Sequence, residues 1–191
     1  MSAQIVNITY VTVPREESDQ FLELHEKFMN LSVSDERTLT WGGVFAHAFA
    51  GDNSFALYDF YASTEDLVFE SETLDWSTKK VVVVSKYEVK WGKTKAFSEG
   101  VINGSLKTLK ESGHAAAAYA SQHLYGSGAD FHTYQFFETW TDFAAYEEAN
   151  IGGPMDEAGK DFWSVIEGHD DEILIFIGGY NSEAKVFGYA I

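Results

Sequence analysis

The chain has 191 residues, of which 45% are hydrophobic and 16% aromatic, and this composition predicts a folded globular protein and excludes a mainly disordered one. The formal net charge is −17 and no run of basic residues interrupts the acidic background, so we expect no nucleic-acid partner and no membrane-surface binding. The absence of cysteine excludes disulfides and thiolate chemistry. With no apolar run long enough to span a bilayer, we expect a cytoplasmic protein.

The first half of the chain is predicted to follow the order strand, helix, strand, strand, helix. β-Branched and aromatic runs indicate the strands, and apolar residues spaced for one helical face indicate the first helix. The second helix is predicted from a capping sequence, Ser63 to Asp66. The predicted elements are strand 4–13, helix 19–31, strands 40–50 and 55–62, and a helix from 63 to about 74.

The second half is predicted to repeat this order and then to add a helix and two strands. Its first five elements are strand 80–91, helix 94–111, strands 115–125 and 131–138, and helix 142–150. The additional elements are helix 155–167, strand 172–178 and strand 184–190. The acidic stretch from His169 to Glu172 is predicted to be a solvated loop, although its side chains could also bind a metal.

The chain repeats itself: residues 44–67 align with residues 120–143 at a constant offset of 76, without a gap. The offset superimposes His47 on His123 and Tyr58 on Tyr134. A shared register of this kind indicates one supersecondary unit used twice. We therefore predict two units, residues 1–78 and 79–191, which are too few for a solenoid and favour a closed pair.

The sequences LYDFYASTEDL and TYQFFETWTDF, at the ends of the repeated segments, resemble the strand-to-helix junction of the dimeric α+β barrel superfamily. This superfamily includes the antibiotic-biosynthesis-monooxygenase family and small stress-responsive barrel proteins. The resemblance implies an α+β fold of two tandem ferredoxin-like repeats that form one barrel within the chain, with the helices outside. Because one chain supplies both halves, a monomer or a weak homodimer is expected.

The resemblance does not extend to the heme-degrading members of that superfamily. Those proteins use an Asn on the first strand, a Trp at the end of the third strand and a His on the second helix. This chain has Asn7 on its first strand, but Tyr61 or Phe137 stands at the place of the Trp, and neither second helix carries a His. We therefore do not expect heme degradation.

The repeated histidines and tyrosines are the first candidates for a site. His47 and His123 lie within predicted strands, where an imidazole could act as acid, base or ligand, or could be a hydrogen-bonded core residue. Tyr58 and Tyr134 could orient a ligand through their hydroxyls or pack in the core. Whether Tyr58 lies across from His47 depends on whether the hairpin pairs position 47 with 57 or with 58.

Four further residues are candidates for ligand contacts. Asp59 lies within an apolar run, where a carboxylate needs a partner and could transfer protons, and Gln135 takes its place in the second copy. Gly100 and Gly104 lie one turn apart on the helix 94–111, where the first copy has large side chains. They are predicted to leave a groove that a neighbouring element or a ligand could fill.

The chain contains no P-loop, dinucleotide fingerprint, nucleophile elbow or zincin motif, and we expect neither a cofactor nor a bound metal. The expected partner is a small apolar or aromatic molecule bound between helices and sheet in the second repeat. As an enzyme, the chain would be a cofactor-independent monooxygenase or isomerase, with His123 as acid or base and Tyr134 or Gln135 orienting the substrate. The alternative is a non-catalytic binding or stress-associated protein with structural histidines, and the sequence leaves both open.

Overall fold

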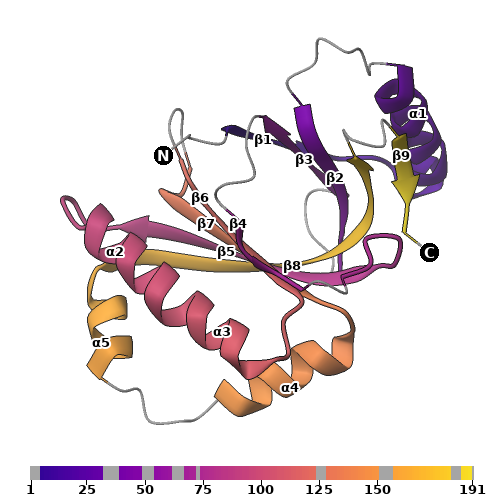
Figure 1. The fold of residues 1–191 in the computed structure, drawn as a ribbon. Helices are drawn as coiled ribbons and strands as arrows, with labels where there is room; N and C mark the ends of the chain where they lie inside the picture. The colour runs from indigo at the N-terminus through magenta and orange to yellow at the C-terminus, as the bar shows by residue number, and fades with distance from the viewer. Residues whose placement is uncertain are drawn as a thin grey trace. The chain divides into compact units, whose positions relative to one another are not determined.

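The computed structural model describes residues 5–31, 39–48, 54–61, 67–71, 74–123, 128–150, 157–181 and 186–190. Within these residues the fold is α+β (Figure 1). The pairs β1–β3, β2–β3, β2–β8, β4–β6, β5–β7, β6–β7 and β8–β9 are antiparallel. The chain divides into two compact units. The first comprises Met1–Asp66, Asp75–Lys80 and Ile173–Ile191, and the second comprises Leu67–Leu74 and Val81–Glu172.

The first unit is a sheet with one helix. Its strands are β1 (Ile5–Val11), β2 (Leu39–His47), β3 (Phe55–Tyr61), the C-terminal part of β8 (Ile166–Asn181) and β9 (Val186–Tyr189), in the order β1-β3-β2-β8-β9. The short 3-10 helix η1 (Arg15–Glu17) leads into α1 (Ser18–Leu31). The core beneath α1 contains Met29, Val44, Phe55, Tyr180 and Phe187, all at most 5% exposed.

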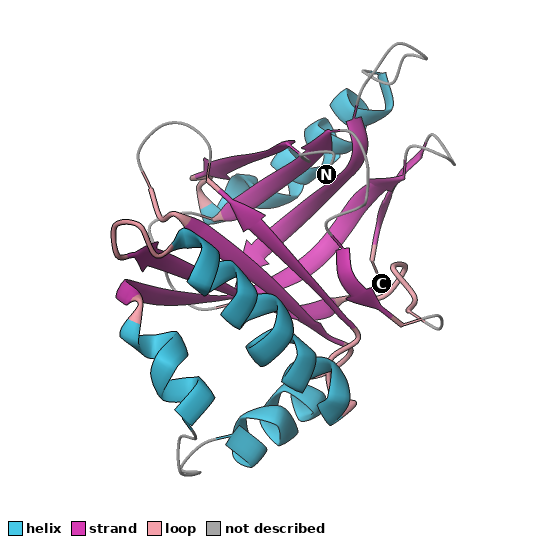
Figure 2. Cartoon of the chain, turned by 60° about the vertical axis from the view of Figure 1, so that its left-hand side comes forward, coloured by secondary structure: helices cyan, strands magenta, loops and turns pink. Residues whose placement is uncertain are grey.

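The second unit is a sheet covered by helices. Its strands are β4 (Leu67–Glu70), β5 (Lys80–Val89), β6 (Ala117–Gln122), β7 (Phe131–Phe137) and the N-terminal part of β8, in the order β8-β5-β7-β6-β4. Its helices are α2 (Thr94–Gly100), the π-helical turn η3 (Val101–Ser105), α3 (Leu106–Ser112), α4 (Trp140–Asn150) and α5 (Glu157–Ser164). All of these helices lie on one side of β5, β6 and β7 (Figures 1 and 2).

The π-helical turn η3 follows from the spacing of the apolar residues that α2 and α3 bury. Phe97 and Val101 are four residues apart, but the next buried residue, Leu106, comes five residues later. One turn with an additional residue keeps Val101 and Leu106 on the face that meets the sheet. The helix ends at Gly113, whose φ of 72° is the left-handed conformation that glycine adopts at helix C-termini.

The strand register of the first unit recurs in the second at the offset found in the sequence. Gly43 pairs with Tyr58 on β2 and β3, and Tyr119 pairs with Tyr134 on β6 and β7. Every described pair of β6 with β7 has a counterpart 76 residues earlier in β2 and β3, and every pair of β5 with β7 has one in β1 and β3. The aligned residues therefore occupy the same positions in their two sheets.

Two strands, β4 and β8, follow elements of one unit in sequence but pair with a strand of the other unit. β4 follows β3 of the first unit but pairs with β6 of the second. β8 begins in the second unit after α5, and its C-terminal part pairs with β2 of the first, from Trp41 with Asn181 to His47 with Leu174. Each sheet is thus completed by a strand that another part of the chain supplies.

Most predicted elements are present, and two predictions are wrong. Residues 67–70, predicted as part of a helix, form β4, because pairing with β6 outweighs the local helical pattern. The predicted capping sequence, Ser63 to Asp66, lies outside the described residues. The stretch from His169 to Glu172, predicted as a loop, lies within β8, which begins at Ile166 rather than at position 172.

Candidate functional site

Strand alternation gives the second sheet a helix-facing side and a helix-free side. Tyr87 faces the helices, since its ring centroid lies 5.0 Å from that of Phe97 on α2 and 6.0 Å from that of Phe162 on α5. The adjacent Lys86 therefore points to the helix-free side. We define the helix-free side by Val82, Val84 and Lys86 of β5, His132, Tyr134 and Phe136 of β7, and Tyr119 and Ser121 of β6.

Polar side chains cross the helix-free side in one line, which we call the polar row: Glu172, Lys86, His132 and Ser121. Lys86 pairs with His132 across β5 and β7, and His132 pairs with Ser121 across β7 and β6. Lys86 Nζ lies 2.7 Å from Glu172 Oε1 on β8, and the two side chains are only 20% and 23% exposed. Since Val82, Val84 and Phe136 on the same side are at most 2% exposed, the polar row borders an apolar surface.

His132 is an uncharged imidazole at neutral pH. Burial of the side chain, followed by electrostatic interactions with Lys86 and His123, lowers the pKa of His132 from 6.5 to about 4, and the carboxylate of Glu172 opposes this effect. The polar row therefore contains one ion pair and one neutral imidazole. Such strongly perturbed titratable groups concentrate at functional sites.

Tyr134 and His123 join the polar row on the same side. The hydroxyl of Tyr134 lies 3.2 Å from Ser121 Oγ, and the Tyr134 ring lies parallel to the His132 ring with 6.3 Å between the centroids. His123 follows β6, where its backbone N–H donates to the carbonyl of Asp130 at 2.7 Å. Two imidazoles, an ammonium, a carboxylate and two hydroxyls thus share one region of the sheet.

The counterpart positions in the first unit carry no polar row. Lys86, His132 and Ser121 correspond at the offset of 76 to Tyr10, Ala56 and Phe45, and the same strand pairs bring these three together. Ala56 and Phe45 are at most 2% exposed. The first sheet thus places aromatic and small side chains where the second places its charges.

His47 and Tyr58 share one side of the first sheet but are not cross-strand partners. The hairpin pairs Gly43 with Tyr58, so position 47 pairs with neither 57 nor 58. Phe45, two residues before His47 on β2, packs edge-on against Tyr58, with 4.8 Å between the ring centroids. His47 Nε2 is buried without a hydrogen-bond partner among the described residues.

The remaining predicted residues lie elsewhere. Gln135 follows Tyr134 on β7 and therefore lies on the helix-facing side, opposite Val83. A Cβ atom at Gly100 would meet Phe162 Cδ2 at 3.1 Å, so α5 occupies that part of the predicted groove, whereas a Cβ at Gly104 would have no contact within 4 Å. The side chain of Asp59 lies outside the described part of the structure.

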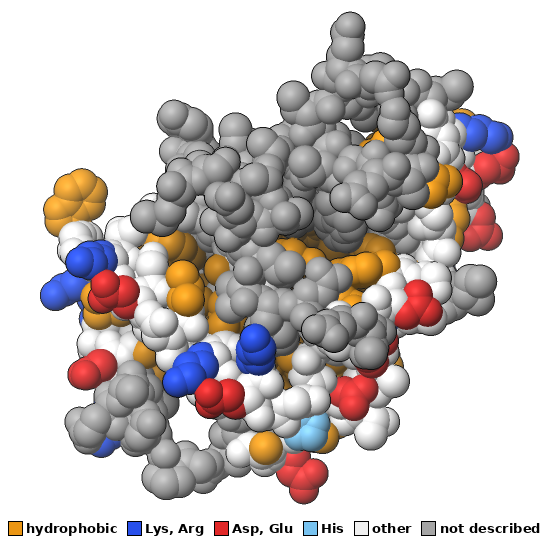
Figure 3. Space-filling model, in the orientation of Figure 1, with side chains coloured by type: hydrophobic (Ala, Val, Ile, Leu, Met, Phe, Trp, Pro, Cys, Tyr) orange, Lys and Arg blue, Asp and Glu red, His pale blue; other side chains and the backbone are white. Residues whose placement is uncertain are grey.

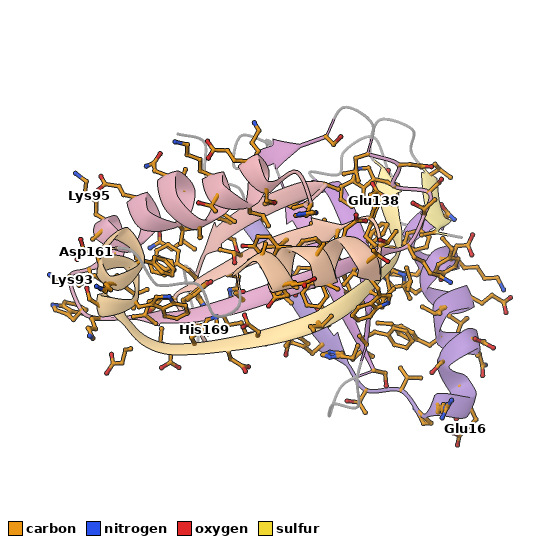
Figure 4. All side chains as sticks on the ribbon, turned by 90° about the horizontal axis from the view of Figure 1, so that it is seen from below. Glu16, Lys93, Lys95, Glu138, Asp161 and His169 are labelled. Carbon is orange, nitrogen blue, oxygen red and sulfur yellow. The ribbon has the colours of Figure 1, made fainter. Side chains whose placement is uncertain are left out.

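The helix-facing side carries a second set of titratable groups that the sequence analysis did not identify. Burial raises the pKa values of Tyr87, Tyr146 and Glu147. His169 lies on β8 (Figure 4). Its ring stacks on that of Tyr87 with 4.8 Å between the centroids, and its Nε2 lies 3.1 Å from the carboxylate of Asp171. His169 thereby contacts Tyr87 of β5 and, with 5.1 Å between the ring centroids, Trp163 of α5.

Two further observations concern the described residues. They contain no group of three or more His, Cys, Asp or Glu side chains that could hold a metal ion. None of their helices is long and apolar enough to cross a membrane. On the face drawn in Figure 3, the described basic side chains lie among acidic ones and form no separate patch.

Comparison with known proteins identifies the fold. The chain matches no protein-family model and no curated protein. Among solved structures, it is similar to an anthrone oxidase-like protein, with a TM-score of 0.68 and 12% identity over 96% of this chain and 94% of that one. It is also similar to a monooxygenase candidate from Lactobacillus acidophilus NCFM, with a TM-score of 0.68 and 11% identity over 98% and 99% of the two chains.

A monooxygenase candidate from Fusobacterium nucleatum subsp. nucleatum has a TM-score of 0.66 and 12% identity over 95% of this chain and 96% of its own. The chain thus has the fold that these three structures share. The resemblance predicted from the two junction sequences is confirmed at the level of the fold. At these identities the likeness concerns the fold, and function has to be argued from the site.

Proposed function

We propose that the chain consists of two tandem ferredoxin-like repeats that form one α+β barrel, and that its second repeat binds and oxidises a small aromatic molecule without a cofactor. The strand pairing that recurs at an offset of 76 supports the repeat. The full-length similarity to three structures, two of them monooxygenase candidates, supports the reaction class.

The observation that carries the proposal is the presence of the polar row in one of two sheets with the same register. A structural requirement of the fold would be expected at both positions, but the first sheet has Tyr10, Ala56 and Phe45 there. Burying charges costs free energy that apolar side chains at these positions avoid. We therefore place the ligand on the helix-free side of the second sheet, rather than between the helices and the sheet as the sequence analysis predicted.

The proposed reaction converts an activated methylene group of an aromatic substrate to a carbonyl. Dioxygen is the oxidant: one of its oxygen atoms enters the carbonyl and the other leaves as water, which balances the two hydrogens lost from carbon. One of the similar proteins is described as anthrone oxidase-like, and anthrone contains such a methylene between two aromatic rings. The acidity of this C–H bond allows a carbanion to react with dioxygen without a metal or flavin.

The chain would contribute proton transfer and orientation. His123 accepts the first proton from carbon and returns it to the peroxide that forms with dioxygen. It then accepts the second proton from carbon as the O–O bond breaks, and returns it to the oxygen that leaves as water. Tyr134, held through Ser121 Oγ at 3.2 Å, orients the substrate carbonyl by a hydrogen bond. The apolar residues beside the polar row contact the substrate rings and exclude water.

The test uses anthrone as the probe and measures both oxygen consumption and the formation of anthraquinone, relative to the rate in buffer alone. In the His123→Gln variant we expect the rate of anthrone oxidation to fall at least about tenfold, as for the removal of a general base, while the melting temperature is unchanged. His114→Gln, after α3 and outside the site, is the control and is expected to keep the wild-type rate.

Two results would contradict the oxygenase proposal. One is a wild-type rate equal to that in buffer, and the other is an unchanged rate in His123→Gln. Binding of anthrone without oxygen consumption would instead favour the alternative from the sequence analysis, a non-catalytic binding protein.

A further inference from the structure

The carboxylate of Glu172 has one paired and one unpaired oxygen. Oε1 accepts from Lys86 Nζ at 2.7 Å, whereas Oε2 is buried and has no hydrogen-bond partner among the described residues. A buried acceptor without a donor is costly, and more so when the acceptor is charged. A ligand that donates to Oε2 would remove this cost, and its hydrogen bond to a carboxylate would be stronger than one between neutral groups.

We infer that Glu172 determines specificity, because it selects ligands that carry a neutral hydrogen-bond donor, such as a hydroxyl or an amide group. The inference rests on the proposed function for the aromatic part of the ligand and adds the donor as a second requirement. The donor gives its hydrogen bond to Glu172 Oε2 and keeps its proton. Ionisation of the donor is opposed, since it would place a second anion beside the carboxylate.

The ion pair explains why the selected group is neutral. Lys86 and Glu172 carry opposite charges, so the pair has no net charge before a ligand binds. With a pKa of about 4, the neighbouring His132 is uncharged and does not alter this balance. A charged ligand group of either sign would leave one charge uncompensated beside side chains that are largely buried. A neutral donor satisfies Oε2 without adding a charge.

The strand order separates the selected group from the reacting carbon. Glu172 lies on β8 and Tyr134 on β7, with β5 between them. At about 4.8 Å between neighbouring strands, the backbones of β8 and β7 are about 10 Å apart. The donor that Glu172 accepts therefore belongs to a different part of the ligand from the carbonyl that Tyr134 orients. Glu172 thus acts on the choice of substrate and not on the oxidation itself.

The test compares two neutral ligands, 2-naphthol and 2-methoxynaphthalene, by isothermal titration calorimetry at pH 7. Both have the same rings and the same oxygen atom, but only 2-naphthol can donate a hydrogen bond. We expect the wild type to bind 2-naphthol at least about tenfold more tightly, because the methyl ether leaves Glu172 Oε2 buried and unpaired. This comparison needs no substitution, so it decides the matter even if a variant does not fold.

Removal of the ion pair tests the assignment of the preference to Glu172. In the Lys86→Met/Glu172→Leu variant, which leaves neither charge alone, we expect the two ligands to bind with equal affinity. Lys86→Arg, which keeps the pair, should retain the preference for 2-naphthol. Lys107→Met/Glu111→Leu, which removes an exposed ion pair on α3, is the matched control and should retain it too. Circular dichroism establishes that each variant is folded.

Three results would overturn the inference. They are a wild type that does not bind 2-naphthol, a wild type that binds both ligands equally, and a preference that persists in Lys86→Met/Glu172→Leu. The measurement involves neither dioxygen nor turnover. A preference for the donor without anthrone oxidation would therefore contradict only the proposed function, whereas anthrone oxidation without this preference would contradict only the role of Glu172.

Discussion

The low pKa of His132 predicts a specific dependence of stability on pH. Between about pH 6.5, where an unfolded histidine titrates, and about pH 4, where His132 titrates in the folded protein, the unfolded state binds more protons. Stability from this residue is therefore complete above pH 6.5 and is lost as the pH falls toward 4. The His132→Gln variant has no such proton to bind and is expected to lack this part of the pH dependence.

The size of the effect follows from the two pKa values. A pKa difference of about 2.5 corresponds to about 3 kcal/mol at 1.36 kcal/mol per unit, and partial exposure of the side chain reduces this to about 2 kcal/mol. Urea unfolding of wild type and His132→Gln at a series of pH values measures it. We expect the difference in unfolding free energy between the two proteins to change by about 2 kcal/mol across this pH range.

The cause of the low pKa can be tested separately by NMR titration of the His132 ring protons. Because burial is the largest cause and Lys86 the second, Lys86→Met should raise the pKa of His132 but leave it below 6.5. The reasoning is refuted if His132 titrates near 6.5 in the wild type, or if the stability difference between wild type and His132→Gln does not vary with pH.

Three further predictions concern the helices of the second unit, and thermal or urea unfolding measures each. Phe97→Ala, at a ring that is 1% exposed, is expected to cost about 3 to 5 kcal/mol, and a loss below 1 kcal/mol would contradict its role in the core. Gly104→Ala should raise the free energy of unfolding by about 0.5 to 1 kcal/mol. Gly100→Ala should raise it by less, because the new methyl group meets Phe162. Equal increases would show that α5 does not close on Gly100. Gly113→Ala, at φ 72°, should destabilise by about 1 kcal/mol, and a neutral result would argue against the left-handed cap.

The local elements could be predicted from the sequence because their periodicity is local. The face of α1 and the aromatic strands around Tyr58 and Tyr134 are visible in short windows. β4 was not predictable in this way, since its conformation depends on pairing with β6, about 50 residues further on. The strand conformation at His169 was not predictable from local sequence either, because the His169 ring stacks on Tyr87 of the distant strand β5.

The polar row could not be predicted from the residues that the two copies share. The shared residues, such as His47 and His123, do not include Lys86 or His132. Lys86 and His132 are residues in which the copies differ, since Tyr10 and Ala56 stand at the equivalent positions. A comparison that searched for polar residues replaced by apolar ones at the offset of 76 would have identified both, but Glu172 required the pairing of β8 with β5.

The exchange of β4 and β8 has a consequence for biosynthesis. Strand β2 leaves the ribosome early, but its neighbour β8 is complete only after Asn181 has been made. Until then the edge of β2 exposes unpaired backbone groups, which invite pairing with other chains. Folding of the first unit is therefore expected to await the synthesis of β8, and expression of residues 1–78 alone should give an aggregating fragment rather than a smaller stable protein.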